Sequence, residues 1–149
     1  MTRERIDEHS TEFGLWLRRQ HQQMIGSHTY SAQNLDYIWH NYKQNWLITI
    51  EEKRYGSRCT FAQRDTHGIV AQMLEMASGT QCRNERGQLV KVEYRGHYVI
   101  VFSNTNPEDG AIRINNQPAT TDDLLRLLTT GCLAIPENLR LFELADVRI

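Results

Sequence analysis

Apolar and polar residues alternate in two neighbouring segments in the first half of the chain. Residues 35–41 and 46–53 are rich in β-branched and aromatic types, and the polar segment 42–45 separates them. Alternation with a period of two places every second side chain on the same face of a strand. The pattern therefore predicts two antiparallel strands that form a hairpin across the polar segment.

Helical spacing of apolar residues predicts two helices around this hairpin. The first has Ser10 or Thr11 as its N-cap and ends near Gly26. The second follows residues 56–57 and ends at residues 78–79. The residues that give this helical stripe are Ile69, Val70, Met73, Leu74, Met76 and Ala77.

The second half of the chain combines strand and helix patterns. Residues 89–104 contain two strand-like runs with residues 95–96 at the apparent turn, which predicts a second hairpin. Residues 112–114 alternate as a further short strand, and the tail from residue 136 is expected to pack at an edge as a short strand or helix. A third helix is capped by Thr120 or Thr121, ends at Gly131 and buries Leu124, Leu125, Leu127 and Leu128.

These elements predict an α+β fold with a three-layer arrangement, in which helices flank a central mixed β-sheet. The chain has 149 residues, of which 40% are hydrophobic and 23% charged. That length and balance suit a globular protein that buries a core without disulfides. The sequence contains no internal repeat or linker, so we expect a single domain over residues 1–149.

Charge and hydropathy indicate which partners and which cellular location to expect for the protein. The net charge is −1, so no global positive field draws the chain to nucleic acid. Arginines nevertheless gather in two local groups, Arg54, Arg58 and Arg64, and Arg83, Arg86 and Arg95. No apolar run is long enough for a membrane span, and the first residues are charged where a signal peptide is apolar. We therefore expect a cytoplasmic protein that does not enter a membrane.

Candidate chemistry lies in the first predicted hairpin. Strand alternation places Glu51 and Lys53 on one face, and a hairpin that closes about residues 43–44 places Asp36 opposite Glu51. Facing carboxylates repel each other unless a cation neutralises them. A Mg²⁺ or Mn²⁺ ion held by Asp36 and Glu51 would remove this conflict, and the backbone carbonyl of Glu52 could supply another oxygen.

This arrangement resembles the PD-(D/E)XK nuclease superfamily over about residues 9–104. Asp36 is followed by Glu51-Glu52-Lys53 on the next strand and then by a helix, as in the signature of that family. The resemblance implies a restriction-endonuclease-like fold and metal-dependent hydrolysis of DNA. It assigns the metal to Asp36 and Glu51, and assistance in hydrolysis to Lys53.

The resemblance also suggests supporting residues. An acidic residue on the preceding helix often joins the metal site, which points to Glu12, and a glutamine on the following helix often assists, which points to Gln63 or to Gln72. Leu35 stands where the family has proline, and residues 28–32 would have to serve as the missing first strand. By analogy, an enzyme of this class that cuts both strands would be a homodimer, and its small size suits a phage or prophage.

Other interpretations of the same residues stay open. The acidic side chains could be solvated surface charges. The chain could also be an inactive binding or adaptor protein of nuclease fold, or a regulatory protein of a phage or mobile element. Zinc is disfavoured because the histidines lack ligand spacing, and the serines have no visible base for a hydrolytic triad. The histidines considered are His28, His40, His67 and His97.

Overall fold

The computed structural model describes residues 12–23 and 33–133 of the chain. The chain divides into two compact units, Met1–Asn34 and Leu35–Ile149. In the first unit the described residues form helix α1 (Glu12–Gln23), on which the rings of Phe13 and Trp16 stack with centroids 5.9 Å apart. The predicted cap and stop of this helix, the predicted strand 28–32 and the tail from residue 136 lie outside the described residues.

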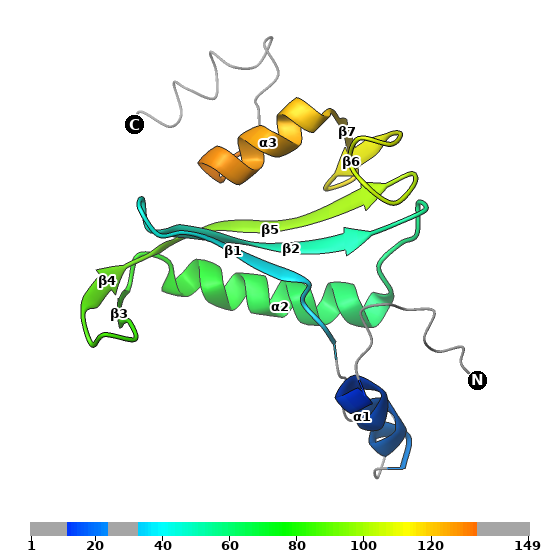
Figure 1. The fold of residues 1–149 in the computed structure, drawn as a ribbon. Helices are drawn as coiled ribbons and strands as arrows, with labels where there is room; N and C mark the ends of the chain where they lie inside the picture. Colours follow the sequence, from blue (N-terminus) through cyan, green and yellow to red (C-terminus); the bar gives the residue numbers. More distant parts are fainter. Residues whose placement is uncertain (1–11, 24–32, 134–149) are drawn as a thin grey trace. The chain divides into compact units, whose positions relative to one another are not determined.

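The second unit is built on a five-stranded mixed sheet (Figure 1). Its strands run in the order β1-β2-β5-β6-β7, and β2 and β5 pair in parallel while the other neighbours are antiparallel. The strands are β1 (Tyr37–Asn41), β2 (Trp46–Lys53), β5 (Glu93–Phe102), β6 (Ile112–Ile114) and β7 (Gln117–Ala119). The predicted α+β class with a central mixed sheet is confirmed.

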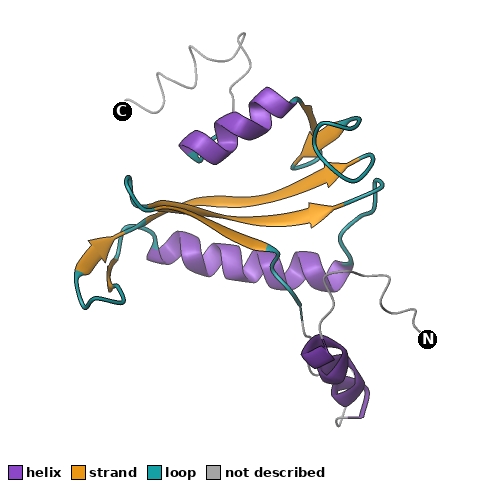
Figure 2. Cartoon of the chain, in the orientation of Figure 1, coloured by secondary structure: helices purple, strands orange, loops and turns teal. Residues whose placement is uncertain are grey.

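Helices lie on both faces of this sheet (Figure 2). Helix α2 (Phe61–Ala77) lies along one face, and helix α3 (Thr121–Thr130) lies on the other. The buried apolar core is on the α3 side, where side chains of β2, β5, β6 and α3 meet. This core consists of Trp46, Ile48, Ile50, Ile100, Phe102, Ile112, Ile114, Leu124 and Leu127. No helix in the described ranges has the length and apolarity that a bilayer crossing requires.

The β1–β2 hairpin has the predicted register. Asn41 pairs with Trp46 and His40 with Leu47, and the pairing continues to Tyr37 and Ile50. The Asn41 side chain accepts hydrogen bonds from the backbone N–H groups of residues 43 and 44 at 2.9 and 2.8 Å, which fixes the turn. The core side chains of β2 all share one strand face, so the predicted alternation is also confirmed.

The hairpin predicted within residues 89–104 is wrong. Strand β4 (Leu89–Lys91) instead pairs with β3 (Gln81–Arg83) in a separate two-stranded sheet, and β5 continues through the expected turn. Residues 95–96 form a bulge opposite Ile48, because the register with β2 shifts there and Gly96 has a φ of 112°. A glycine that looked like a turn therefore accommodates an extra residue in a long strand.

Helix α3 follows the prediction except in one residue. Thr120 is the N-cap and forms a capping box with Asp123, and Gly131 ends the helix in the left-handed region with a φ of 72°. Leu124 and Leu127 are buried, but Leu125 is 60% exposed because it points away from the sheet. Strand β7 was not predicted. Asn115 and Asn116, both at positive φ, turn the chain back from β6 into it.

Helix α2 forms as predicted, but most of its apolar stripe is exposed. Ile69, Val70, Met73 and Met76 are exposed, and the buried residue of this helix is His67. The face of β2 that α2 covers carries the buried polar residues Thr49 and Glu51 beside the half-buried Leu47. The helix face with the lowest exposure is likewise mixed, with polar Gln63 and His67 beside apolar Ala71 and Leu74.

Candidate functional site

Asp36 and Glu51 lie where the hairpin register predicts. Continuing the β1–β2 pairing by one residue beyond Tyr37 and Ile50 places Asp36 opposite Glu51. Asp36 Oδ2 accepts a hydrogen bond from the backbone N–H of Glu52 at 2.7 Å. That bond holds the Asp36 carboxylate against β2 just before β1 begins, so the two acidic side chains are close neighbours.

Glu51 is a buried carboxylate with unused hydrogen-bonding capacity. Its side chain is only 3% exposed, and its Oε1 is buried with no hydrogen-bond partner among the described residues. Burial raises the pKa of Glu51, and the negative charge of Asp36 raises it further, while Lys53 and His67 act in the opposite direction. The protein therefore holds Glu51 in a place where its charge is incompletely compensated.

Lys53 and Gln63 meet beside this carboxylate. The Lys53 Nζ lies 3.5 Å from Glu51 Oε2 and donates a hydrogen bond to Gln63 Oε1 at 2.9 Å. The same Gln63 oxygen accepts from the Thr60 N–H at 3.0 Å, and the Gln63 N–H donates to Thr60 Oγ1 at 3.1 Å. This capping box begins α2, so the first turn of the helix positions the lysine.

The remaining predicted residues are Glu52, Gln72 and Glu12. The Glu52 side chain forms an ion pair with Arg54 at 3.3 Å, so any contribution of Glu52 to a metal would come from its backbone carbonyl. Gln72 is exposed on α2, and Gln63 is the glutamine next to Lys53. Glu12 is exposed in the first unit, and the site is built here from residues of the second unit alone.

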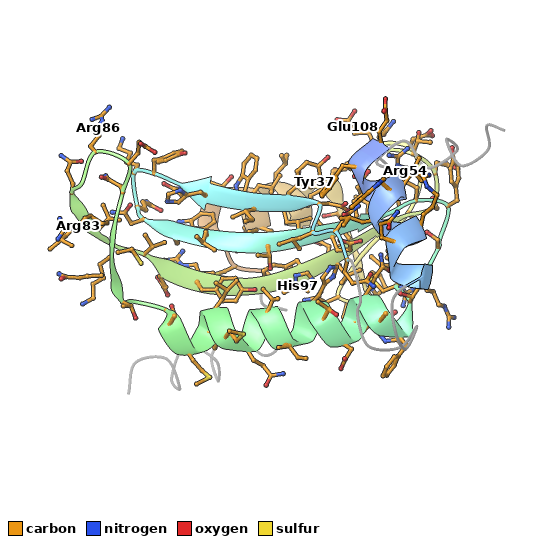
Figure 3. All side chains as sticks on the ribbon, turned by 90° about the horizontal axis from the view of Figure 1, so that it is seen from below. Tyr37, Arg54, Arg83, Arg86, His97 and Glu108 are labelled. Atoms are coloured by element: carbon orange, nitrogen blue, oxygen red, sulfur yellow. The ribbon has the colours of Figure 1, made fainter. Side chains whose placement is uncertain are left out.

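A polar cluster on the Glu51 face of β2 was not predicted from the sequence. We call it the polar layer, and it consists of Thr49, Tyr94, His67 and His97. Thr49 Oγ1 lies 2.8 Å from both the Tyr94 hydroxyl and His97 Nδ1, and the His97 ring meets His67 edge-on at 5.3 Å. Figure 3 shows His97 between β5 and α2. Burial lowers the pKa of His97, and His67 lowers it further. The available signals were Thr49 on the Glu51 face and His67 one helical turn after Gln63.

The donor set fits a hard divalent cation. Mg²⁺ typically takes one or two carboxylates and completes its shell with water and substrate oxygens. Asp36 and Glu51 supply that pair, and the partnerless Glu51 Oε1 is an oxygen that a cation would satisfy. Within residues 12–23 and 33–133 no three His, Cys, Asp or Glu side chains gather as a metal-ligating group. A cation here would therefore take its remaining ligands from water and substrate.

No protein-family model, curated protein or solved structure matches this chain.

Proposed function

We propose that this chain is a metal-dependent nuclease that hydrolyses phosphodiester bonds of DNA, with a restriction-endonuclease-like fold of the PD-(D/E)XK type. The observation that carries the proposal is Glu51, a buried carboxylate beside Asp36 with one oxygen that lacks a hydrogen bond. A purely structural residue at this position would be costly, because an unsatisfied buried polar group is destabilising. A cytoplasmic setting, a phage or prophage origin and a homodimer stay predictions.

Each side chain has a distinct role in this proposal. Asp36 and Glu51 hold Mg²⁺ or Mn²⁺, which when bound would polarise the phosphate and lower the pKa of a water. Lys53 orients the attacking water or stabilises charge on the phosphate, as a compact cation can. Gln63 is a positioning residue, because its side-chain oxygen holds the Lys53 ammonium at 2.9 Å.

The surroundings of the site favour an anionic substrate. Arg58 and Arg64 are exposed in the segment that joins β2 to α2 and in the first turn of α2. Arg64 is held by a hydrogen bond from its Nη1 to the Cys59 carbonyl at 2.8 Å. The start of a helix also carries partial positive charge. These groups lie next to Lys53 and Gln63 in the chain and would attract phosphate.

The decisive experiment combines metal binding with DNA cleavage. The full chain is titrated with Mn²⁺ or Mg²⁺ in a thermal melt, and then incubated with plasmid, linear duplex and single-stranded DNA. The variants are Asp36→Ala, Glu51→Gln and Lys53→Ala, with Glu108→Gln as a matched control because Glu108 is an exposed carboxylate on a loop. We expect metal to raise the melting temperature of the parent and the control, since a ligand of the folded state stabilises it.

The variants test metal binding and DNA cleavage separately. Asp36→Ala and Glu51→Gln should lose both the metal-induced shift and cleavage, whereas Lys53→Ala should keep most of the shift and lose cleavage by at least about a hundredfold. If metal stabilises the parent but no DNA is cut, the metal site stands and the nuclease assignment fails. If all four variants melt and cleave like the parent, the site itself is wrong.

A further inference from the structure

The β3–β4 hairpin is a projecting element that contributes nothing to the core. Residues 80–89 and Lys91 are all exposed, and the hairpin extends beyond the C-terminal end of α2 (Figure 1). Its base is anchored by the Gly79 N–H, which donates to the Val92 carbonyl at 2.9 Å. An ordered segment that buries so little apolar surface gains little stability from burial, so its exposed face is a candidate for binding.

The tip of this hairpin is rigidly built. Asn84 Oδ1 accepts hydrogen bonds from the backbone N–H groups of Arg86 and Gln88 at 3.0 and 2.9 Å, and the Asn84 N–H donates to the Gln88 carbonyl at 2.9 Å. Gly87 has a φ of 78°, which suits a residue without a Cβ. The hairpin therefore presents its side chains in a fixed arrangement and loses little entropy on binding.

One face of the hairpin is basic. Arg83 pairs with Leu89 and Gln81 pairs with Lys91, so these four side chains share a face while Cys82 and Val90 share the other. Lys91 forms no ion pair within the described chain, and the Arg83 Nη1 donates only to the Gly87 carbonyl at 2.8 Å. With Arg86 at the tip, residues 81–91 carry three cations against the carboxylate of Glu85, in a chain whose net charge is −1.

The basic face of the hairpin is separated from the candidate site by the length of helix α2. The candidate site lies at the start of α2 and the hairpin follows its end, and Figure 3 shows Arg54 and the pair Arg83 and Arg86 at opposite ends of the strands. Helix α2 has 17 residues, which span about 25 Å at about 1.5 Å per residue. The hairpin strands add about 10 Å. The sum corresponds to about ten base pairs of duplex DNA.

We propose that the Arg83–Leu89–Lys91 face of the β3–β4 hairpin is a second DNA-contacting surface, which binds backbone phosphates about ten base pairs from the cleavage site. The inference rests on the proposed function, and it adds where the duplex lies on the protein. A two-stranded ribbon can follow a groove of duplex DNA, and cations that touch phosphates supply affinity without sequence preference.

The test measures DNA binding separately from cleavage. Fluorescence anisotropy with the full chain in EDTA follows binding to a labelled duplex of about 30 base pairs between about 50 and 200 mM salt. The variant Arg83→Gln/Lys91→Gln is compared with Arg113→Gln/Arg126→Gln, which removes the same charge from exposed positions of β6 and α3. Circular dichroism and the metal-induced melting shift check that each variant folds.

We expect the hairpin variant to bind at least about tenfold more weakly at about 0.1 M salt, with a salt slope shallower by about 1.8, or about 0.9 for each lost phosphate contact. The control variant should behave like the parent. Equal losses in both variants, or no loss in either, would overturn the inference. If the parent cleaves DNA but the hairpin variant binds DNA as tightly as the parent, only this inference fails. If the hairpin variant binds more weakly but no protein cleaves DNA, the proposed nuclease activity fails and the hairpin is still a DNA-binding surface.

Discussion

Glu51 is the residue at which burial and charge conflict most directly. Its carboxylate lies on the polar face of β2, is almost fully buried, and faces Asp36 with one oxygen unsatisfied. Such a group lowers the stability of the metal-free fold, because the folded state disfavours its charged form. Functional sites often hold ionisable groups in surroundings that disfavour their charged form. Binding of a ligand then raises the stability of the folded protein.

The conflict at Glu51 predicts a pH-dependent effect of Glu51→Gln in EDTA. The pKa of Glu51 is raised from its ordinary value of 4.5, so the stabilising contribution of the protonated form is present below that value and is lost as pH rises through the folded pKa. Near neutral pH the neutral glutamine should therefore stabilise the chain relative to the parent, and this gain should shrink at acidic pH. Urea unfolding of both proteins below pH 4.5 and near neutral pH measures this difference, and a difference independent of pH would contradict the prediction.

At the level of elements, the start of α2 and the site depend on the same residue. Gln63 closes the capping box with Thr60 and also accepts from Lys53, so disorder in the first helical turn would release the lysine. Helix α3 has a capping box of the same kind, formed by Thr120 and Asp123, on the opposite face of the sheet. The two helices thus offer a matched pair for separating helix stability from activity.

We predict that Thr60→Ala and Thr120→Ala each lower the free energy of unfolding by about 1 kcal/mol, because both remove an N-cap hydroxyl. Only Thr60→Ala should also reduce cleavage, since only that cap shares its glutamine with Lys53. Denaturant unfolding and single-turnover cleavage at saturating metal measure the two effects. Equal activity of the two variants would show that Gln63 holds Lys53 without help from the cap.

At the level of the whole molecule, the apolar core and the candidate site lie on opposite faces of the sheet. The face toward α3 carries the buried apolar core, and the face toward α2 carries the polar layer and the candidate site. Four residues of the apolar stripe of α2 are exposed, namely Ile69, Val70, Met73 and Met76. Most of the hydrophobic free energy therefore comes from one side of the molecule.

This asymmetry predicts different costs for truncating apolar residues on the two helices. Leu127→Ala on α3 should lower the free energy of unfolding by about 2–5 kcal/mol, because Leu127 is fully buried. Ile69→Ala on α2 should change it by less than about 0.5 kcal/mol, because Ile69 is 51% exposed. Chemical unfolding of both variants measures the contrast. A large loss for Ile69→Ala would mean that its outer face is covered in the native protein.

The parts of the fold that were predictable are those fixed by local pattern. The position of the turn at residues 43–44 determined the β1–β2 register and therefore the placement of Asp36 opposite Glu51, and Thr120 and Gly131 marked the ends of α3. The parallel pairing of β2 with β5 was not predictable, because the choice of a distant partner leaves no local signal. Gly96 was misinterpreted for a related reason, since a bulge and a turn both favour a residue that accepts positive φ.

Within the site, too, local pattern predicted the neighbours along one strand, but not the contacts between segments that are distant in sequence. Residues 51 and 53 share a strand face by geometry alone, whereas His67 and His97 come together from a helix and a strand that are distant in sequence. The orientation of α2 was also hidden, because an apolar stripe predicts burial only when the opposing surface is apolar. Here the opposing surface carries Thr49 and Glu51 as well as Leu47, and most of the stripe is exposed.

The register of the β1–β2 hairpin also bears on how the chain folds. Asp36 and Glu51 are joined by a short hairpin, whereas Glu51 reaches its parallel neighbour Val99 only after α2 and the β3–β4 hairpin have been placed. Contacts of low sequence separation form early, because closing a short loop costs less entropy. We therefore expect the two carboxylates to meet in the hairpin before β5 pairs with β2. If a divalent cation binds Asp36 and Glu51 as proposed, it would relieve their repulsion in this hairpin, and we predict that it accelerates refolding as well as slowing unfolding.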